Sequence, residues 1–182
     1  MGHSRSERMA GREAALLYLF GMDFSAESWP GGFGVFWESD PLGTARESLE
    51  DSEEFASPPA AGKTPPGAEA RDYADRLSAA VLRDREALDG LIIRALDHWA
   101  PDRVGRVEWI ILRLGLCEMR AFPDVPPQVA ISEAVNLAKR FGAAESPRFV
   151  NGVLDRIHKA PPGWGGGGAE EPAPPEDSPG DD

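Results

Sequence analysis

The stretch DVPPQVAISEAVNLAKRFGAAESPRFVNGVLDRI, residues 124–157, predicts two consecutive helices. Pro126 and Pro127 are typical of a helix start, because a first-turn residue has no intrahelical partner for the N–H that proline lacks. Apolar residues then recur at helical spacing, and Gly142 is expected to end the helix in the left-handed conformation. Ser146, followed by proline, repeats the start signal as the N-cap of the second helix. The second apolar stripe consists of Val150, Val153, Leu154 and Ile157.

The segment before this hairpin, residues 102–122, is apolar on nearly all sides. Arg106, Arg113 and Arg120 recur at seven-residue spacing and predict one solvent-facing line on an otherwise buried helix. Further helical stripes run over residues 9–22, 69–81 and 88–99. Because no strand pattern is found, the predicted fold class is all-α.

The hairpin block closely resembles the C-terminal signature of the NusB family of bacterial transcription antitermination and ribosomal-RNA synthesis factors. The segment from Trp99 to Met119 looks like the family's central helix, and the segment from Arg12 to Asp23 looks like its first helix. The resemblance covers roughly residues 8–23 and 69–159. It implies a bundle of about seven helices, arranged in two subdomains that share a core.

The predicted organisation places a helical domain over residues 9–159, after a flexible N-terminal arm at residues 1–8. Residues 24–68 read as a divergent, partly mobile insertion, because acidic and Pro/Gly-rich runs replace most of the family's second helix. Residues 160–182 form an acidic Pro/Gly-rich tail that is predicted to be disordered. A short version of the second helix is expected around Phe33, Val35, Phe36 and Trp37.

The formal net charge of −12 is unusual for an RNA-binding protein, but it is unevenly distributed along the chain. Residues 38–55 contain seven acidic residues and one arginine, and residues 160–182 contain six acidic and no basic residues. The remaining chain has 18 acidic and 18 basic residues and is neutral. We therefore expect a weak grip on phosphate by this protein alone, and a need for a basic partner or specific contacts.

Catalysis has little support in the sequence, and no cofactor or metal site is expected. His3, His98 and His158 are scattered, and no Gly-rich phosphate loop follows a strand. The one cysteine, Cys117, has no activating base nearby in sequence and is expected to be a core residue. The absence of a membrane-length apolar run and of a signal peptide favours the cytoplasm and no membrane association.

The resemblance implies a binding role. Family members pair with NusE, a small-subunit ribosomal protein, and hold boxA-like single-stranded RNA, so that the transcription elongation complex resists termination and ribosomal RNA is transcribed. Arg5, Arg8 and Arg12 match the family's arginine-rich N-terminus, and guanidinium groups suit phosphates and base edges. The alternative is a solvated helix start of mixed charge, since Glu7 and Glu13 interleave with these arginines.

A second candidate RNA patch is the start of the last helix, where Ser146, Arg148, Phe149 and Asn151 match family positions near the RNA. A helix N-terminus attracts phosphate, and a partly exposed aromatic ring can stack on an unpaired base. Phe149 could instead belong to the core stripe beside Val150. Glu145 is expected to repel phosphate and weaken binding.

For the protein partner, Asp84, Glu108 and Glu118 are candidate contacts to a basic ribosomal protein, and the alternative is that they are ordinary surface carboxylates. Two other hypotheses for the whole chain stay open. One is a diverged interaction module that has kept a protein partner and lost RNA binding. The other is a homodimer that covers the RNA patch.

Overall fold

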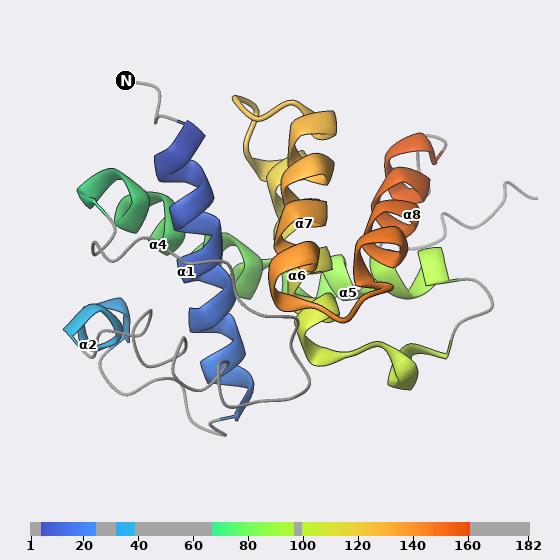
Figure 1. Ribbon diagram of the computed structural model, residues 1–182, viewed down its shortest axis with the longest axis horizontal. Helices are drawn as coiled ribbons and strands as arrows, with labels where there is room; N and C mark the ends of the chain where they lie inside the picture. Colours follow the sequence, from blue (N-terminus) through green and yellow to red (C-terminus); the bar gives the residue numbers. More distant parts are fainter. Residues whose placement is uncertain (1–4, 25–31, 39–66, 97–99, 161–182) are drawn as a thin grey trace, which may run out of the picture.

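The computed structural model describes residues 5–24, 32–38, 67–96 and 100–160. Within these ranges the protein has seven α-helices, one short 3₁₀ helix and no strand, which confirms the all-α prediction (Figure 1). The elements are α1 (Arg5–Phe24), α2 (Gly32–Glu38), α4 (Ala68–Arg83), α5 (Arg85–Leu96), η1 (Pro101–Arg103), α6 (Arg106–Ala121), α7 (Pro127–Phe141) and α8 (Ser146–Lys159). None of the described helices combines the length and the apolar character that crossing a bilayer requires.

Helices α1 and α4 pack against each other. Gly11 permits their close approach, because a Cβ at this position would lie 2.8 Å from the backbone oxygen of Ala70. The predicted short helix is confirmed as α2, where Phe36 is buried and meets the Tyr18 ring edge to face at 5.0 Å. The rest of the predicted insertion, except the ends of its neighbouring helices, lies outside the described residues.

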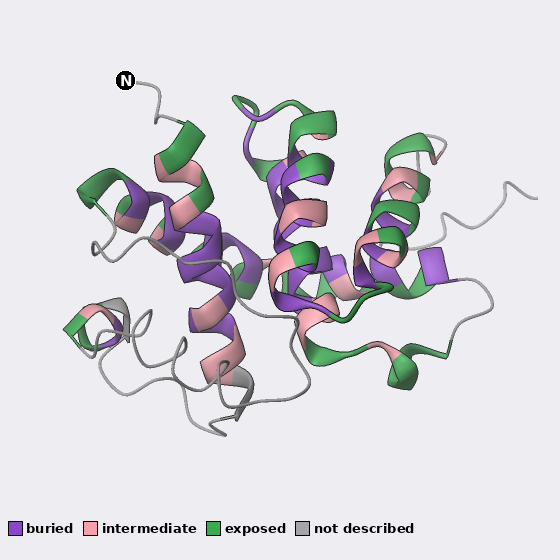
Figure 2. Ribbon diagram, in the orientation of Figure 1, coloured by how far each residue is buried: buried purple, intermediate pink, exposed green. Residues whose placement is uncertain are grey.

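Helix α6 is the centre of the molecule and contacts α1, α4, α5, α7 and α8. Residues 110–118 are all buried, so the helix is surrounded as its composition predicts (Figure 2). The predicted solvent-facing line on α6 is wrong at Arg113. Its guanidinium is buried and donates two hydrogen bonds to the carboxylate of Asp89 on α5, at 2.7 and 2.8 Å. Cys117 is a core residue, as predicted.

The predicted C-terminal hairpin is confirmed as α7 and α8, with two corrections at its turn. Gly142 ends α7 at a φ of −99°, so it is not left-handed. It is instead required by space, because a Cβ there would lie 2.6 Å from the Cβ of Ser146. Ser146 is the first residue of α8 rather than its N-cap.

Helix α1 begins at Arg5, four residues before the predicted start at Met9. Residues 5–8, which were expected to belong to a flexible arm, are therefore helical. The first turns of α1 lie beside the start of α7 (Figure 1), where carboxylates of the C-terminal half meet their arginines. The predicted tail lies outside the described residues from position 161 onwards.

Candidate nucleic-acid interface

The first candidate patch is the arginine end, which we define as Arg5, Arg8 and Arg12 on the first turns of α1. Arg12 is buried, with 3% of its surface exposed, and its Nε donates to both carboxylate oxygens of Glu118, at 2.8 and 3.0 Å. The Tyr73 hydroxyl donates to the same carboxylate, and the guanidinium lies over the Tyr73 ring. A second carboxylate, that of Glu133, lies 3.8 Å from the Arg12 guanidinium.

The prediction that Arg12 contacts RNA disagrees with this geometry, as does the prediction that Glu118 faces a protein partner. Glu118 is 1% exposed, and neither side chain can reach a ligand while their pair is intact. Burial raises the pKa of the Glu118 carboxyl, and the charge of Arg12 and the hydroxyl of Tyr73 oppose that rise. Together these groups tie α1, α4 and α6 to one another.

The other two arginines of this end also face carboxylates. The Arg8 guanidinium is half-buried and donates to Asp124 Oδ2 at 2.6 Å. Arg5 is 88% exposed, and its nearest carboxylate oxygen, on Glu133, is 3.5 Å away. Only Arg5 therefore presents most of its guanidinium to solvent, and the arginine end is closer to neutral than its sequence suggests.

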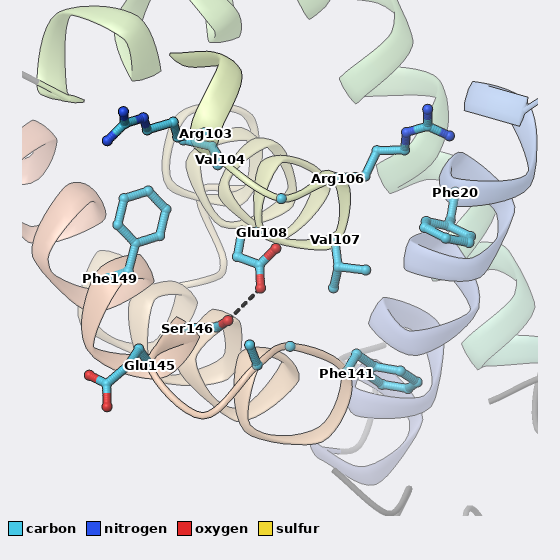
Figure 3. Close-up of a pocket in the computed structure, with 13 residues that line it drawn as sticks. Phe20, Arg103, Val104, Arg106, Val107, Glu108, Phe141, Glu145, Ser146 and Phe149 are labelled. Atoms are coloured by element: carbon cyan, nitrogen blue, oxygen red, sulfur yellow. Dashed lines mark hydrogen bonds between the residues drawn. The ribbon is translucent and has the colours of Figure 1, made fainter. Parts of the chain in front are cut away.

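Two residues of the second candidate patch, Ser146 and Phe149, line a cavity of about 490 Å³, which we call the α6–α8 groove. It is lined by residues 103–108 before and on α6, residues 141–143, 145 and 146 at the α7–α8 turn, Phe20 of α1 and Phe149 of α8. Phe149 and Arg103 lie on one side of the hydrogen bond between Glu108 and Ser146, and Phe20 and Arg106 lie on the other (Figure 3). The groove thus combines aromatic rings with two guanidinium groups.

The predicted residues of α8 have different positions around this groove. Arg148 and Asn151 are exposed, and Phe149 is half-buried, packing against the core while it lines the cavity. The two readings of Phe149, core or stacking face, are therefore compatible. Ser146 is buried, and its hydroxyl donates to Glu108. Its position suits holding the start of α8 against α6 rather than contacting a ligand.

Arg103 and Arg106 were not predicted as site residues, although both are exposed and line the groove. Their signal in the sequence is the run Asp-Arg-Val-Gly-Arg, residues 102–106, directly ahead of the central helix. The structure brings this run beside Phe149, which follows it by more than forty positions.

Of the remaining candidate partner contacts, Glu108 lies in the groove. Asp84 lies at the junction of α4 and α5, where Arg83 donates two hydrogen bonds to its carboxylate, at 2.6 and 2.9 Å. This hydrogen bonding lowers the pKa of Asp84. Both residues remain accessible enough to meet a partner, unlike Glu118.

The two patches lie at opposite ends of α1 and α7. Helix α7 has 15 residues. At 1.5 Å per residue, about 20 Å separates its start, beside the arginine end, from its end at the groove. Figure 1 shows α1 and α7 descending together, with α8 returning from the groove. A ligand would have to span this distance to use both patches.

In the described part of the chain, no three His, Cys, Asp or Glu side chains gather as a metal site would require. His3 and His98 lie outside the described residues. The lining of the α6–α8 groove instead combines cations, aromatic rings and a helix start, and these are the groups that bind anions and bases.

Comparison with known proteins agrees with the resemblance seen in the sequence. The profile of the NusB family matches residues 9–159. The transcription antitermination protein NusB of Sorangium cellulosum (strain So ce56) is 39% identical over 150 residues, which cover 82% of this chain and 90% of that protein. The NusB of Desulfotalea psychrophila (strain LSv54 / DSM 12343) is 40% identical over 152 residues, covering 84% and 95%. A crystal structure of the antitermination factors NusB and NusE in complex with dsRNA contains a chain that is similar at a TM-score of 0.58 and 26% identity, with coverage of 86% and 98%.

Proposed function

The chain belongs to the NusB family, and from this premise we propose that it is a transcription antitermination factor that binds boxA-like single-stranded RNA together with NusE. This role is binding without catalysis, in keeping with a family of transcription factors rather than enzymes. Support for ribosomal RNA transcription, association with the elongation complex and a cytoplasmic location stay predictions.

The observation that carries the proposal is the α6–α8 groove. There, a half-buried aromatic ring stands beside exposed guanidinium groups that come from two separate helices. An unpaired base can stack on the Phe149 ring, and the flanking phosphates can pair with Arg148 at the start of α8 and with Arg103 opposite. Asn151, on the exposed face of α8, is placed to hydrogen-bond a base edge.

Dependence on a basic partner follows from the charges. The described cations near the groove are opposed by Glu145, which is exposed beside Arg148, and by Glu108. With so small an excess of positive charge, the phosphate contribution to affinity is small. The similar chain in the solved NusB–NusE–dsRNA complex is crystallised together with NusE. Asp84 and Glu108 remain the candidate contacts to it.

The test is a titration of fluorescently labelled boxA RNA with this chain, alone and mixed with its cognate NusE. We expect binding to strengthen by at least tenfold when NusE is present. Arg148→Ala should weaken the binding of RNA to the mixture, while Arg120→Ala, at the far end of α6, serves as the matched control. Equal affinities for the two variants would remove the groove from the RNA site.

A second candidate function is an interaction module that keeps NusE and has lost RNA recognition. The internal pairing of Arg8 and Arg12 favours it, because these charges are not available to phosphate. A pull-down that retains NusE, with no RNA bound at any point of a salt series, would support this candidate over the first. Sedimentation of the same samples tests the predicted homodimer.

A further inference from the structure

We propose that the α6–α8 groove holds one unpaired guanine of the RNA, and that the Glu108 carboxylate selects this base by accepting hydrogen bonds from its N1–H and 2-amino groups. This selection rests on the proposed function, since it concerns how the same groove reads RNA. Glu108 is then a specificity-determining residue as well as a candidate contact to NusE.

The lining of the groove is neutral in charge. The guanidinium groups of Arg103 and Arg106 are balanced by the carboxylates of Glu108 and Glu145. A phosphate in the middle of the groove would face the carboxylates as well as the cations, so it would gain little there. A nucleobase has no net charge and carries both donors and acceptors on its edges, so it suits a neutral lining that contains aromatic rings.

Glu108 lies in the middle of the groove lining, with Phe149 on one side of it and Phe20 on the other (Figure 3). It is half-buried, and the Ser146 hydroxyl donates a hydrogen bond to its carboxylate from the start of α8. Gly105 leaves room for this carboxylate, because a Cβ at that position would collide with Glu108 Oε2. The acceptor oxygens are therefore held in place before a ligand arrives.

The hydrogen-bonding pattern of guanine matches a carboxylate better than the patterns of the other RNA bases. A carboxylate can accept about four hydrogen bonds, so the bond from Ser146 leaves capacity for a base. Guanine presents neighbouring N1–H and 2-amino donors on its Watson–Crick edge. Adenine and cytosine place a ring acceptor beside their amino group, and uracil places a carbonyl oxygen on each side of its N–H, so these edges meet the carboxylate poorly. A guanine stacked on Phe149 can turn its donors toward Glu108.

Glu145 is the other carboxylate of the lining and provides the matched control. It is exposed at the α7–α8 turn, whereas Glu108 is half-buried and bonded to Ser146. An exposed carboxylate orders a base poorly, because it loses side-chain entropy on binding and water competes for its hydrogen bonds. Replacing either glutamate by glutamine removes one negative charge from the groove. A difference between the two variants therefore reflects position and not charge.

The direct test uses mononucleotides and the full-length chain without NusE, because Glu108 is also a candidate contact to that partner. The monophosphates of guanosine, inosine and adenosine have the same charge, and inosine differs from guanosine only in lacking the 2-amino group. Titrations followed by NMR should show saturable binding of the guanosine nucleotide, at least about fivefold tighter than that of the other two. Glu108→Gln should remove most of this preference, and Glu145→Gln should keep it. No binding of the guanosine nucleotide, or an unchanged preference in Glu108→Gln, would overturn the proposal.

A further variant separates base selection from a structural role of Glu108. Ser146→Ala breaks the hydrogen bond between α6 and α8 but keeps the carboxylate. If Glu108→Gln binds no nucleotide, a retained guanine preference in Ser146→Ala supports selection by the carboxylate. Loss of binding or of the preference in Ser146→Ala as well would show that Glu108 only holds α8 in place, which would overturn the proposal.

A second measurement uses RNA, with the chain mixed with NusE. A short oligouridine with one central guanine should bind at least about fivefold more tightly than the same oligouridine without it. Equal binding of the two RNAs would overturn guanine selection and leave the proposed function intact. Failure of both RNAs and of boxA RNA to bind would instead sink the proposed function, and the mononucleotide titration would then decide whether the groove selects guanine.

Discussion

The arginine end carries three arginines and the α6–α8 groove is lined by two, Arg103 and Arg106, and the two regions differ in how far their guanidinium groups are buried. At the arginine end, Glu118 and Asp124 come from the opposite half of the chain and pair with Arg12 and Arg8. In the groove, Arg103 and Arg106 are exposed, and Arg148, which precedes Phe149 in the chain, is exposed as well. Similar sequence features thus serve two purposes: one set holds the helices together, and the other faces solvent.

The largest expected effect is on the free energy of unfolding, and it concerns the arginine that holds the helices together. Arg12→Met should lower the free energy of unfolding by about 3–5 kcal/mol, because it leaves the Glu118 carboxylate buried without its cation. The double variant with Glu118→Gln should recover much of this loss, as measured by urea unfolding. Lys159→Met, which breaks a surface pair with Asp155, is the control and should cost under about 1 kcal/mol. A small loss for Arg12→Met would show that this arginine is not structural.

The next effect is on RNA binding and should be confined to the groove. Phe149→Leu keeps an apolar side chain against the core but removes the stacking face, so affinity should fall by about 1–3 kcal/mol in a titration with NusE present. Val129→Ala changes an exposed apolar residue beside Arg5 and Arg8 and should leave affinity unaltered. Comparable losses of affinity for both variants would show that RNA contacts both regions.

Alkaline pH sharpens the comparison, because it ionises the Cys117 thiol of the unfolded chain while the groove guanidinium groups stay charged. Burial raises the pKa of the Cys117 thiol to about 12. The unfolded thiol ionises from about pH 8.5, so the folded protein should lose about 1–2 kcal/mol of stability between that pH and pH 10. Urea unfolding at both pH values should show a smaller loss for Cys117→Ala. An equal loss in the variant would assign the pH dependence to other groups.

The smallest effect is an increase in affinity. Glu145 is exposed beside Arg148 and lines the groove, so Glu145→Gln should strengthen RNA binding about two- to threefold in low salt. Glu86→Gln, on the exposed start of α5, is the charge-matched control. If both substitutions strengthen binding equally, the effect comes from the net charge of the protein and not from the groove.

The sequence predicts local structure well and long-range pairing poorly. Periodicity and proline positions located α7 and α8, because these signals lie within the helices themselves, whereas the short α2 was indicated by the family resemblance. The burial of Arg12 depends on Glu118, which is 106 positions away, and no local pattern records it. The same applies to Arg113, whose partner Asp89 lies on another helix.

The candidate site was predicted only in part for the same reason. Arg148, Phe149 and Asn151 follow from the helix start, and the structure places all three at the surface or in the groove wall. Arg103 and Arg106 join them only after α6 and α8 have packed. A cation's availability is set by its three-dimensional neighbours, which spacing along the chain does not reveal.

The most direct test of this account compares two charge-matched double variants in a salt series, each mixed with NusE and titrated with boxA RNA. Arg103→Gln with Arg148→Gln should weaken binding about tenfold in low salt and reduce the salt dependence by about 1.4 in log–log slope, the value for two lost phosphate contacts on a single strand. Arg5→Gln with Arg8→Gln should stay within about twofold of the native chain, with the slope nearly unchanged. The opposite pattern, with the loss confined to Arg5 and Arg8, would contradict the assignment of RNA binding to the α6–α8 groove.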